Sequence, residues 1–267
     1  MRSAGFSLVE LAVAMGIMAI VLTGIMVPMV TQIAQRNVTV TEKTLSEIRD
    51  ALLGFAAANG RLPCPAVTTP TGPVPNPDGS EAFAAGGNAS NGRCLSFTGF
   101  VPGRTLGITP VDRNGYALDA WGATANRIRY AVSSDAVTTI TPNVTNPFTS
   151  VNGMRNATLG EVAKIPALLT ICDSGIGVQA GVNCNAARTL TSSAVAVIWS
   201  VGANVSTGGG TGADERENPN PQDETSADRI FVSRTMSGIA NNPFDDIVTW
   251  LSINTLVNRM VSAGQLP

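Results

Sequence analysis

The sequence contains no histidine and only two lysines, Lys43 and Lys164. Without histidine the chain cannot form a Ser-His-Asp triad, a Cys-His dyad, a His-x-x-x-His zinc site or a histidine-ligated haem. Charged residues make up only 13% of the chain, and 17 basic residues face 19 acidic ones. Nucleic-acid binding needs clustered positive charge, so this balance argues against a nucleic-acid partner. The composition therefore disfavours an enzyme and a nucleic-acid-binding protein.

A strongly apolar segment without any charge, residues 11–30, lies close to the N-terminus. A helix rises about 1.5 Å per residue, so this segment would cover roughly the 30 Å hydrocarbon core of a bilayer. The run is longer than the apolar region of about 7–15 residues in a secretory signal peptide, and no Ala-x-Ala pattern closes it. Hydropathy alone favours a simple signal anchor. Two features are not typical of a simple signal anchor. The first is a very short leader that contains Arg2. The second is Glu10, an ionisable residue at the edge of the span, where a charge is energetically costly.

Residues 5–11, Gly-Phe-Ser-Leu-Val-Glu-Leu, resemble the cleavage and methylation motif of type IV prepilins and type II secretion pseudopilins. In that family a membrane peptidase cuts after the glycine and N-methylates the new terminal residue. The resemblance implies cleavage between Gly5 and Phe6, methylation of Phe6, and a role for Glu10 in assembly. We therefore expect a leader at residues 1–5 and a transmembrane and polymerisation helix at residues 6–30.

The same resemblance implies the partners and the location of the protein. The expected partners are a prepilin peptidase, an inner-membrane assembly platform, the lipid bilayer before assembly, and other copies or other pilins in a helical filament. Glu10 would pair with the terminal amine of Phe6 on a neighbouring subunit, which would offset part of the cost of a carboxylate in lipid. The protein is then expected in the bacterial inner membrane as a single-pass protein with a periplasmic C-terminal domain, and later in a pilus or pseudopilus.

An amphipathic half of the long helix is predicted at residues 31–60. Apolar residues recur there at spacings of three and four, which places them on one helical face: Leu45, Ile48, Leu52, Phe55 and Ala56. We expect this face to pack on the protein's own sheet. Gly60 is a stop signal for the helix. Gly24 and Pro28 predict a kink or a local opening farther upstream.

The rest of the chain, residues 61–267, is predicted to be a soluble pilin-like domain. It begins with an insert rich in proline and glycine, residues 61–110, which we interpret as loop with a short strand at residues 95–97. Strand-like runs follow at residues 127–132, 194–201 and 229–232. A helical face over residues 245–263 predicts a closing helix. The fold class is therefore α+β: a long N-terminal helix packed on a small antiparallel sheet, with extended disulfide-bearing loops.

Two segments of this domain extend the resemblance to the major pseudopilins of type II secretion. Residues 118–130 resemble their Asp-Pro-Trp-Gly…Tyr segment, with Ala120 in place of the usual proline. Residues 200–212 resemble their Ser-x-Gly-Ala-Asp…Gly-Gly-Thr loop, with Asn204 in place of aspartate. The chain is much longer than a typical major pseudopilin, so its size and loop content favour a minor or specialised subunit.

The four cysteines contain no Cys-x-x-Cys pair: Cys64, Cys94, Cys172 and Cys184. A zinc site without histidine would need all four thiolates, and their spacings do not resemble a zinc ribbon. A domain outside the inner membrane lies where disulfides persist. Three pairings are possible, and proximity in sequence favours Cys64–Cys94 and Cys172–Cys184. Free buried thiols are the alternative.

An acidic segment follows the glycine-rich loop. Carboxylates cluster at residues 214–228 and again at residues 245–246, and those we single out are Asp214, Glu215, Asp228, Asp245 and Asp246. Ca²⁺ takes six to eight oxygen ligands, often from loops. The EF-hand spacing is absent, so a solvated acidic loop is the plainer interpretation. The pseudopilin resemblance implies Ca²⁺ at this C-terminal loop, with individual ligands left open by Asn204 and by the loop length.

Together these patterns predict a prepilin, cleaved and methylated, that serves as a structural subunit of a type IV pilus or a type II secretion pseudopilus. Its work would be mechanical and adhesive rather than catalytic. The alternative is a single-pass, membrane-anchored periplasmic binding or adhesion protein that does not polymerise.

Overall fold

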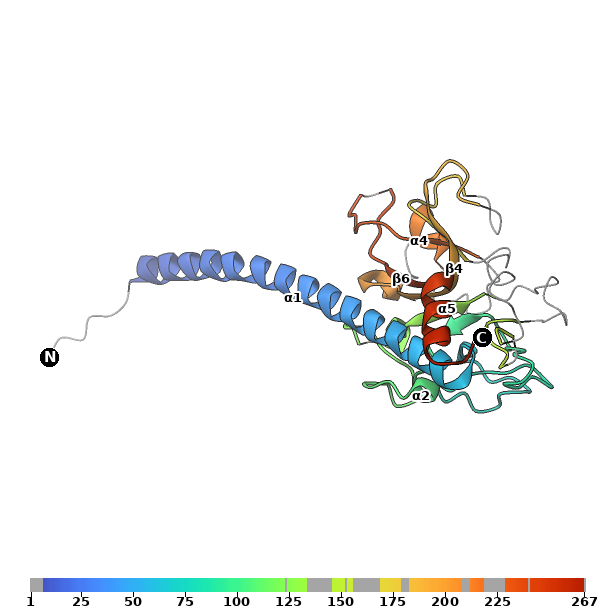
Figure 1. Ribbon diagram of the computed structural model, residues 1–267. Helices are drawn as coiled ribbons and strands as arrows, with labels where there is room; N and C mark the ends of the chain where they lie inside the picture. Colours follow the sequence, from blue (N-terminus) through green and yellow to red (C-terminus); the bar gives the residue numbers. More distant parts are fainter. Residues whose placement is uncertain are drawn as a thin grey trace.

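A long helix projects from a mixed helix-and-sheet domain in the computed structural model of the chain (Figure 1). The structure describes residues 7–122, 124–133, 146–151, 153–155, 169–178, 183–207, 212–218, 229–239 and 241–266; for residues 22–30, 124, 206 and 207 it describes the backbone alone. The C-terminal half of the helix lies against the domain, and its N-terminal half extends away from it (Figure 1).

Helix α1, Leu8–Asn59, is one continuous helix of 52 residues. It ends at Gly60, which has a φ of 71°, a left-handed conformation that glycine adopts without steric penalty. The predicted stop at Gly60 is therefore confirmed. The helix continues through Gly24 and Pro28 without the local opening that these residues predict, and it bends only gently (Figure 1).

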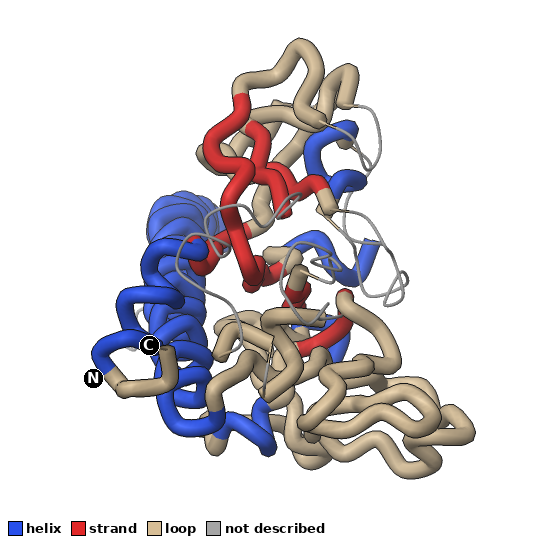
Figure 2. The backbone as a smooth tube through the Cα atoms, turned by 45° about the vertical axis from the view of Figure 1, so that its right-hand side comes forward, coloured by secondary structure: helices blue, strands red, loops and turns tan. Residues whose placement is uncertain are grey.

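The six strands of the described chain form one sheet in the order β1–β2–β4–β3–β5, with β6 also paired to β4. The strands are β1 Thr98–Phe100, β2 Arg129–Val132, β3 Leu169–Cys172, β4 Thr189–Ser200, β5 Ile230–Val232 and β6 Ile247–Ser252. All pairs are antiparallel except β3 with β5. The central strand is β4, because it pairs with β2, β3 and β6, and α1 runs along one side of the strands (Figure 2).

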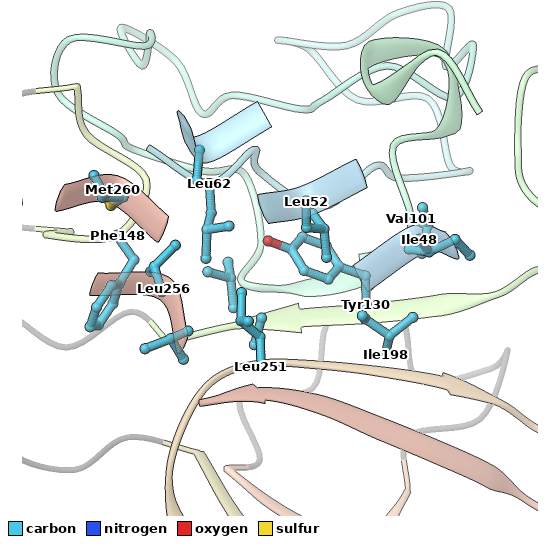
Figure 3. Close-up of a cluster of buried hydrophobic side chains, with 14 of the residues drawn as sticks. Ile48, Leu52, Leu62, Val101, Tyr130, Phe148, Ile198, Leu251, Leu256 and Met260 are labelled. Atoms are coloured by element: carbon cyan, nitrogen blue, oxygen red, sulfur yellow. The ribbon is translucent and has the colours of Figure 1, made fainter. Parts of the chain in front are cut away.

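The buried face of α1 packs on this sheet as its apolar spacing predicts. Leu45, Ile48 and Leu52 are at most 1% exposed and share one core cluster with Tyr130 and Ile198 of the sheet (Figure 3). On the opposite face of the sheet, Trp199 and Phe231 pack in a second cluster. Both faces of β4 are thus covered, which explains why its last seven residues are all buried.

The predicted helix at residues 245–263 is wrong over its first part. The structure has strand β6 there, and helix α5, Ile253–Ser262, begins only after it. The side chains of β6 alternate, with Ile247 and Leu251 in the first core cluster and Val248 and Trp250 against the second. That is the period of a strand, and β-branched and aromatic residues favour a strand. Ser252 caps α5 by accepting a hydrogen bond from the Thr255 backbone N–H at 3.3 Å.

The sequence patterns located three of the six strands correctly, misplaced β1, and missed β3 as well as β6. The predicted runs at residues 127–132, 194–201 and 229–232 contain or overlap β2, β4 and β5. Strand β1 follows the predicted strand at residues 95–97 instead of coinciding with it. Strand β3 was not predicted. It is only four residues long and is bounded by Asp173, so its hydrophobic pattern is too short to identify a strand.

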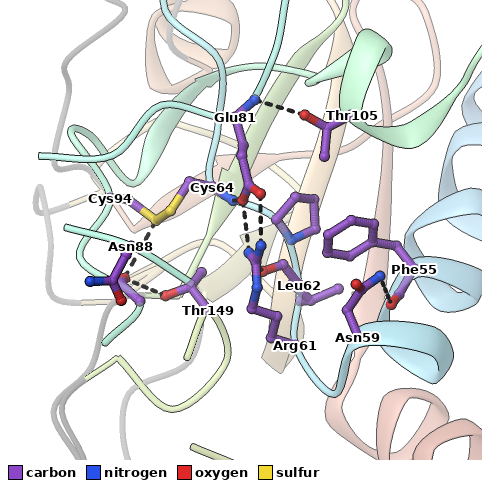
Figure 4. Close-up of polar contacts among 12 residues, drawn as sticks. Phe55, Asn59, Arg61, Leu62, Cys64, Glu81, Asn88, Cys94, Thr105 and Thr149 are labelled. Atoms are coloured by element: carbon purple, nitrogen blue, oxygen red, sulfur yellow. Dashed lines mark hydrogen bonds and ion pairs between the residues drawn. A yellow bond between two sulfur atoms is a disulfide. The ribbon is translucent and has the colours of Figure 1, made fainter. Parts of the chain in front are cut away.

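The insert after α1 is fixed to the helix end by a buried ion pair. Arg61 is 5% exposed and donates from both terminal nitrogens to the Glu81 carboxylate, each at 2.7 Å (Figure 4). Glu81 also accepts the Cys64 backbone N–H at 3.2 Å, and the Cys64–Cys94 disulfide closes the insert. The insert also contains the short helix α2, Gly103–Leu106. The interpretation of this insert as mostly loop agrees with the structure.

Candidate functional site

The N-terminal half of α1 presents apolar side chains that nothing in the described chain covers. Nine of them are 51–86% exposed: Leu8, Val9, Leu11, Val13, Met15, Ile17, Met18, Ile20 and Val21. A contiguous apolar surface of this kind marks a site of contact with lipid or with another protein. We refer to these nine side chains as the apolar face of α1.

Glu10 lies in the first turn of this helix and helps to cap it. Its carboxylate accepts the Ser7 backbone N–H at 3.0 Å, and the Ser7 hydroxyl accepts the Val9 N–H at 3.3 Å, an arrangement known as a capping box. Gly5 and Phe6 lie outside the described residues. The predicted roles of Gly5, Phe6 and Glu10 therefore stay predictions.

The membrane span predicted at residues 6–30 is not established by the structure. Within the described part of the chain, no helix combines the length and the apolar character needed to cross a membrane.

Three of the five predicted metal ligands come together at one end of the sheet. Single carboxylate oxygens of Glu215, Asp245 and Asp246 all lie within 4.8 Å of one another. Glu215 belongs to the short helix α4, Ala213–Glu217, while the two aspartates directly precede β6. We call these three side chains the carboxylate cluster.

Two side chains of the carboxylate cluster are buried, Asp245 is half-buried, and the cluster is incompletely hydrogen-bonded. Glu215 is 1% exposed and Asp246 is 3% exposed. Glu215 Oε2, Asp245 Oδ1 and Asp246 Oδ1 have no hydrogen-bond partner, and no arginine or lysine among the described residues pairs with any of the three. Buried polar atoms without a partner are rare in proteins, because each one costs free energy on folding. No positive charge from the described residues therefore compensates the three carboxylates.

The pKa values of the cluster reflect this missing charge. Burial, together with the negative charge of Asp245, raises the pKa of Glu215 to about 7. Burial, and then the charges of Asp245 and Glu215, raises the pKa of Asp246 well above its usual range. Either protons or a cation would relieve the repulsion, and three oxygens within 4.8 Å suit a hard cation such as Ca²⁺.

The other two predicted ligands are not part of the cluster. Asp214 faces away from it and accepts hydrogen bonds from Ser174 at 2.8 Å, from the Gly175 backbone at 2.6 Å, and from Arg234. Burial alone would raise the pKa of Asp214, but these bonds outweigh it and lower the pKa. Its oxygens are thus already occupied. Asp228 lies outside the described residues.

Asparagine side chains support the cluster, and the sequence patterns did not single them out as ligands or supports. Asn218 donates to Asp246 Oδ2 at 2.7 Å, and Asn204 donates to Glu215 Oε1 at 2.8 Å. The backbone N–H groups of Ala203 and Asn204, at the start of the 3₁₀ helix η2 (Ala203–Thr207), donate to Asp245 Oδ2 at 2.7 and 3.1 Å. Asparagine is common in loops, so only the three-dimensional contacts identify these residues.

A buried network holds the loop that carries these N–H groups. Asp119 accepts hydrogen bonds from Ser200 at 2.5 Å and from Asn126 at 3.1 Å, and Asn126 also donates to the Gly202 carbonyl at 2.6 Å. Asn126 ends the 3₁₀ helix η1, Thr124–Asn126. A Cβ at Gly202 would lie 2.6 Å from the Asp245 carboxyl carbon, so only glycine allows this approach. Of the two segments with local pseudopilin resemblance, one contacts the carboxylate cluster through residues 203–204, and the other holds that loop through Asp119 and Asn126.

Both disulfides that sequence proximity favours are formed. Cys64 pairs with Cys94 and Cys172 pairs with Cys184, and no described cysteine is free. The second bond closes the loop that contains Gly175, whose N–H binds Asp214. The loop is thereby joined to α4, next to the carboxylate cluster.

Comparison with known families identifies the N-terminal segment. Residues 1–26 match the family described as the prokaryotic N-terminal methylation motif, which is the signature of type IV pilins and pseudopilins. The comparison with curated proteins gives no match, and the comparison with solved structures gives none either. The matched segment contains Glu10 and the whole apolar face of α1.

Proposed function

We propose that the chain is a type IV pilin-like prepilin that a prepilin peptidase cleaves after Gly5 and methylates on Phe6. The mature protein then serves as a minor structural subunit of a type IV pilus or a type II secretion pseudopilus. The observation that carries this proposal is the methylation motif at residues 1–26. The motif belongs to structural subunits, and the chain has no histidine for the common catalytic centres, so the work of the protein is mechanical.

The two halves of α1 would have separate tasks in such a subunit. The C-terminal half buries Leu45, Ile48 and Leu52 against the sheet of its own chain, so this helical face is already covered. The apolar face of the N-terminal half has no cover within the described chain. Before assembly it would lie in the inner membrane, with the domain in the periplasm, and after assembly it would pack against the same helices of neighbouring subunits.

The filament fraction tests this proposal against the alternative of an anchored protein that does not polymerise. We expect the processed chain to be present in filaments sheared from cells that carry the matching assembly system, and to remain in the membrane when the assembly platform is deleted. A chain that stays in the membrane fraction of assembly-competent cells would favour the anchored alternative.

We also propose that the carboxylate cluster binds Ca²⁺ with Glu215, Asp245 and Asp246 as ligands. The observation that favours this second role is the set of three buried oxygens without partners and without a positive charge beside them. Backbone carbonyls and water would complete the six to eight oxygens that Ca²⁺ requires. The ion would join α4 to the start of β6 and so stabilise the domain of the filament subunit.

Removal of calcium is expected to lower the melting temperature of the protein. A ligand at a hundred times its dissociation constant adds about 2.7 kcal/mol to the free energy of unfolding. In chelator, the raised pKa values of Glu215 and Asp246 mean that folding takes up protons. Stability should then be highest near pH 4.5 and fall as the pH rises through about 7, whereas the gain from Ca²⁺ should grow over the same range.

The variant Glu215→Gln distinguishes two hypotheses: that the cluster binds a cation, and that it is an acidic cluster that binds no ligand. Glutamine removes one charge from the cluster, so in chelator at pH 8 this variant should melt at a higher temperature than the wild type. It should also respond less to Ca²⁺. The exposed Glu42→Gln is the matched control and should behave as the wild type. Equal melting curves of the wild type in Ca²⁺ and in chelator, with Mg²⁺ as the control for charge screening, would exclude the site.

A further inference from the structure

The edge strands of the sheet differ in how their outer backbone groups are hydrogen-bonded in the described part of the chain. At β1, Phe100 exchanges two backbone hydrogen bonds with Ala66, at 2.8 and 2.9 Å, so this edge is closed by the insert. At β5, the Asn218 side chain bonds both the N–H and the carbonyl of Val232, at 2.8 and 3.0 Å. Proteins commonly cover or interrupt sheet edges in such ways, because free edges pair with other chains.

No other described strand pairs with the outer edge of β6. Strand β6 pairs with β4 on one side only, and in an antiparallel ladder alternate residues direct their N–H and carbonyl groups to the other side. No backbone hydrogen bond from residues 247–252 to anything but β4 and α5 is present among the described residues. The strand contains no proline, no lysine and no charged residue to prevent pairing.

A groove of about 840 Å³ runs beside this edge, and it is lined by β6, α1, the start of α5 and Ser233, which follows β5. Leu53 of α1 and Trp250 of β6 supply apolar surface in it. The groove continues along α5 for about another 500 Å³, past Arg259. A free strand edge with a groove beside it is the geometry in which an extended peptide binds by adding a strand.

Charge indicates which kind of segment fits this groove. Arg49 and Arg259 line it, and no ion pair holds either of them within the described residues. Asp50 is the single carboxylate that lines the same stretch. The lining thus carries a net positive charge in a protein whose overall charge is −2. Complementary charge sets which partner binds and in which register.

We propose that this groove binds an extended, acidic peptide segment of a partner protein, which adds to the sheet as a strand beside β6. Backbone hydrogen bonds to β6 would supply affinity, Leu53 and Trp250 would contact alternate side chains, and Arg49 and Arg259 would select acidic residues. The site faces a different part of the molecule from the apolar face of α1 and does not depend on it. The interaction therefore goes beyond the role as a filament subunit.

Three fluorescent peptides test the proposal on the full-length protein in detergent micelles. The first is acetyl-Glu-Val-Thr-Val-Thr-Val-Glu-amide; the second has lysine for both glutamates; the third has proline for the central valine. We expect saturable binding of the acidic peptide, binding of the lysine peptide weaker by about tenfold, and no binding of the proline peptide. Hydrogen exchange should slow at residues 247–252 when the acidic peptide is bound.

Charge reversal on α1 provides the matched variants. Arg49→Glu should weaken binding of the acidic peptide by about tenfold and strengthen binding of the lysine peptide. Lys43→Glu on the same helix should leave the binding of both peptides unchanged. Absence of binding, equal binding of the acidic and lysine peptides, or binding without slower exchange in β6 would each overturn the proposal. Protection of β6 that rises with protein concentration in the absence of peptide would also overturn it, because the occupant would then be a second copy of the chain.

Discussion

Replacing Glu10 by alanine is expected to leave cleavage after Gly5 intact and to abolish incorporation into filaments. The peptidase would act at the Gly5–Phe6 bond, upstream of the altered side chain. In the assembled filament, the Glu10 carboxylate would pair with the Phe6 amine of a neighbouring subunit and so fix the register between helices. An unpaired amine in an apolar helix bundle is costly, so loss of the carboxylate should prevent assembly. Immunoblots of membrane and sheared filament fractions measure both steps.

Glu10 also caps α1 through Ser7. Two further variants therefore distinguish the pairing of Glu10 with the Phe6 amine from its role as a helix cap. Glu10→Gln keeps an oxygen that can accept the Ser7 N–H but removes the charge, and it should fail to assemble as alanine does. Ser7→Ala removes part of the cap, at a cost of about 1 kcal/mol, and should still assemble. Normal filaments from Glu10→Gln would contradict the pairing, and failure of Ser7→Ala alone would point to the cap.

Replacing both Cys64 and Cys94 by serine is expected to lower the stability of the domain by about 3–4 kcal/mol. The disulfide joins residues 30 apart in sequence, and in the chain-entropy model a loop of that size restricts the unfolded chain by this amount. For a domain of this size, the melting temperature should fall by roughly 10 °C. Differential scanning calorimetry of the variant and the wild type measures the effect.

The second disulfide provides the comparison for the first. Cys172 and Cys184 are only 12 residues apart, so the same model gives about 3 kcal/mol for their removal. Peptide mapping without reduction should show the two linked peptide pairs in the wild type. A Cys64→Ser, Cys94→Ser variant that melts with the wild type would show that the insert is held by other contacts, such as the Arg61–Glu81 pair.

The sequence predicted those parts of the fold that depend on local chemistry. The end of α1 follows from Gly60, and the buried face of α1 follows from the spacing of Leu45, Ile48 and Leu52. Both disulfides follow from short sequence separation. The helix end and the buried face of α1 depend on residues that are close in sequence, and each cysteine pairs with the cysteine nearest to it in the chain.

The features that the sequence did not reveal depend on distant contacts. The apolar spacing over residues 245–263 predicts a helix that includes residues 247–252, whereas their alternation and their pairing with β4 make them a strand. The carboxylate cluster takes Glu215 from α4 and two aspartates from the segment before β6, while Asp214, next to Glu215, is turned toward Arg234. Adjacent residues on a short helix point in different directions, so the acidic sequence alone could not tell which carboxylates belong to the cluster and which pair with an arginine.

The intact mass of the mature protein tests the central claim most directly. Mass spectrometry of the chain purified from its host membrane should show the loss of residues 1–5 and the addition of one methyl group, with fragment ions that place the methyl group on the amine of Phe6. The same chain from cells without a prepilin peptidase should retain residues 1–5. A mature protein that still begins at Met1 in peptidase-competent cells would contradict the account.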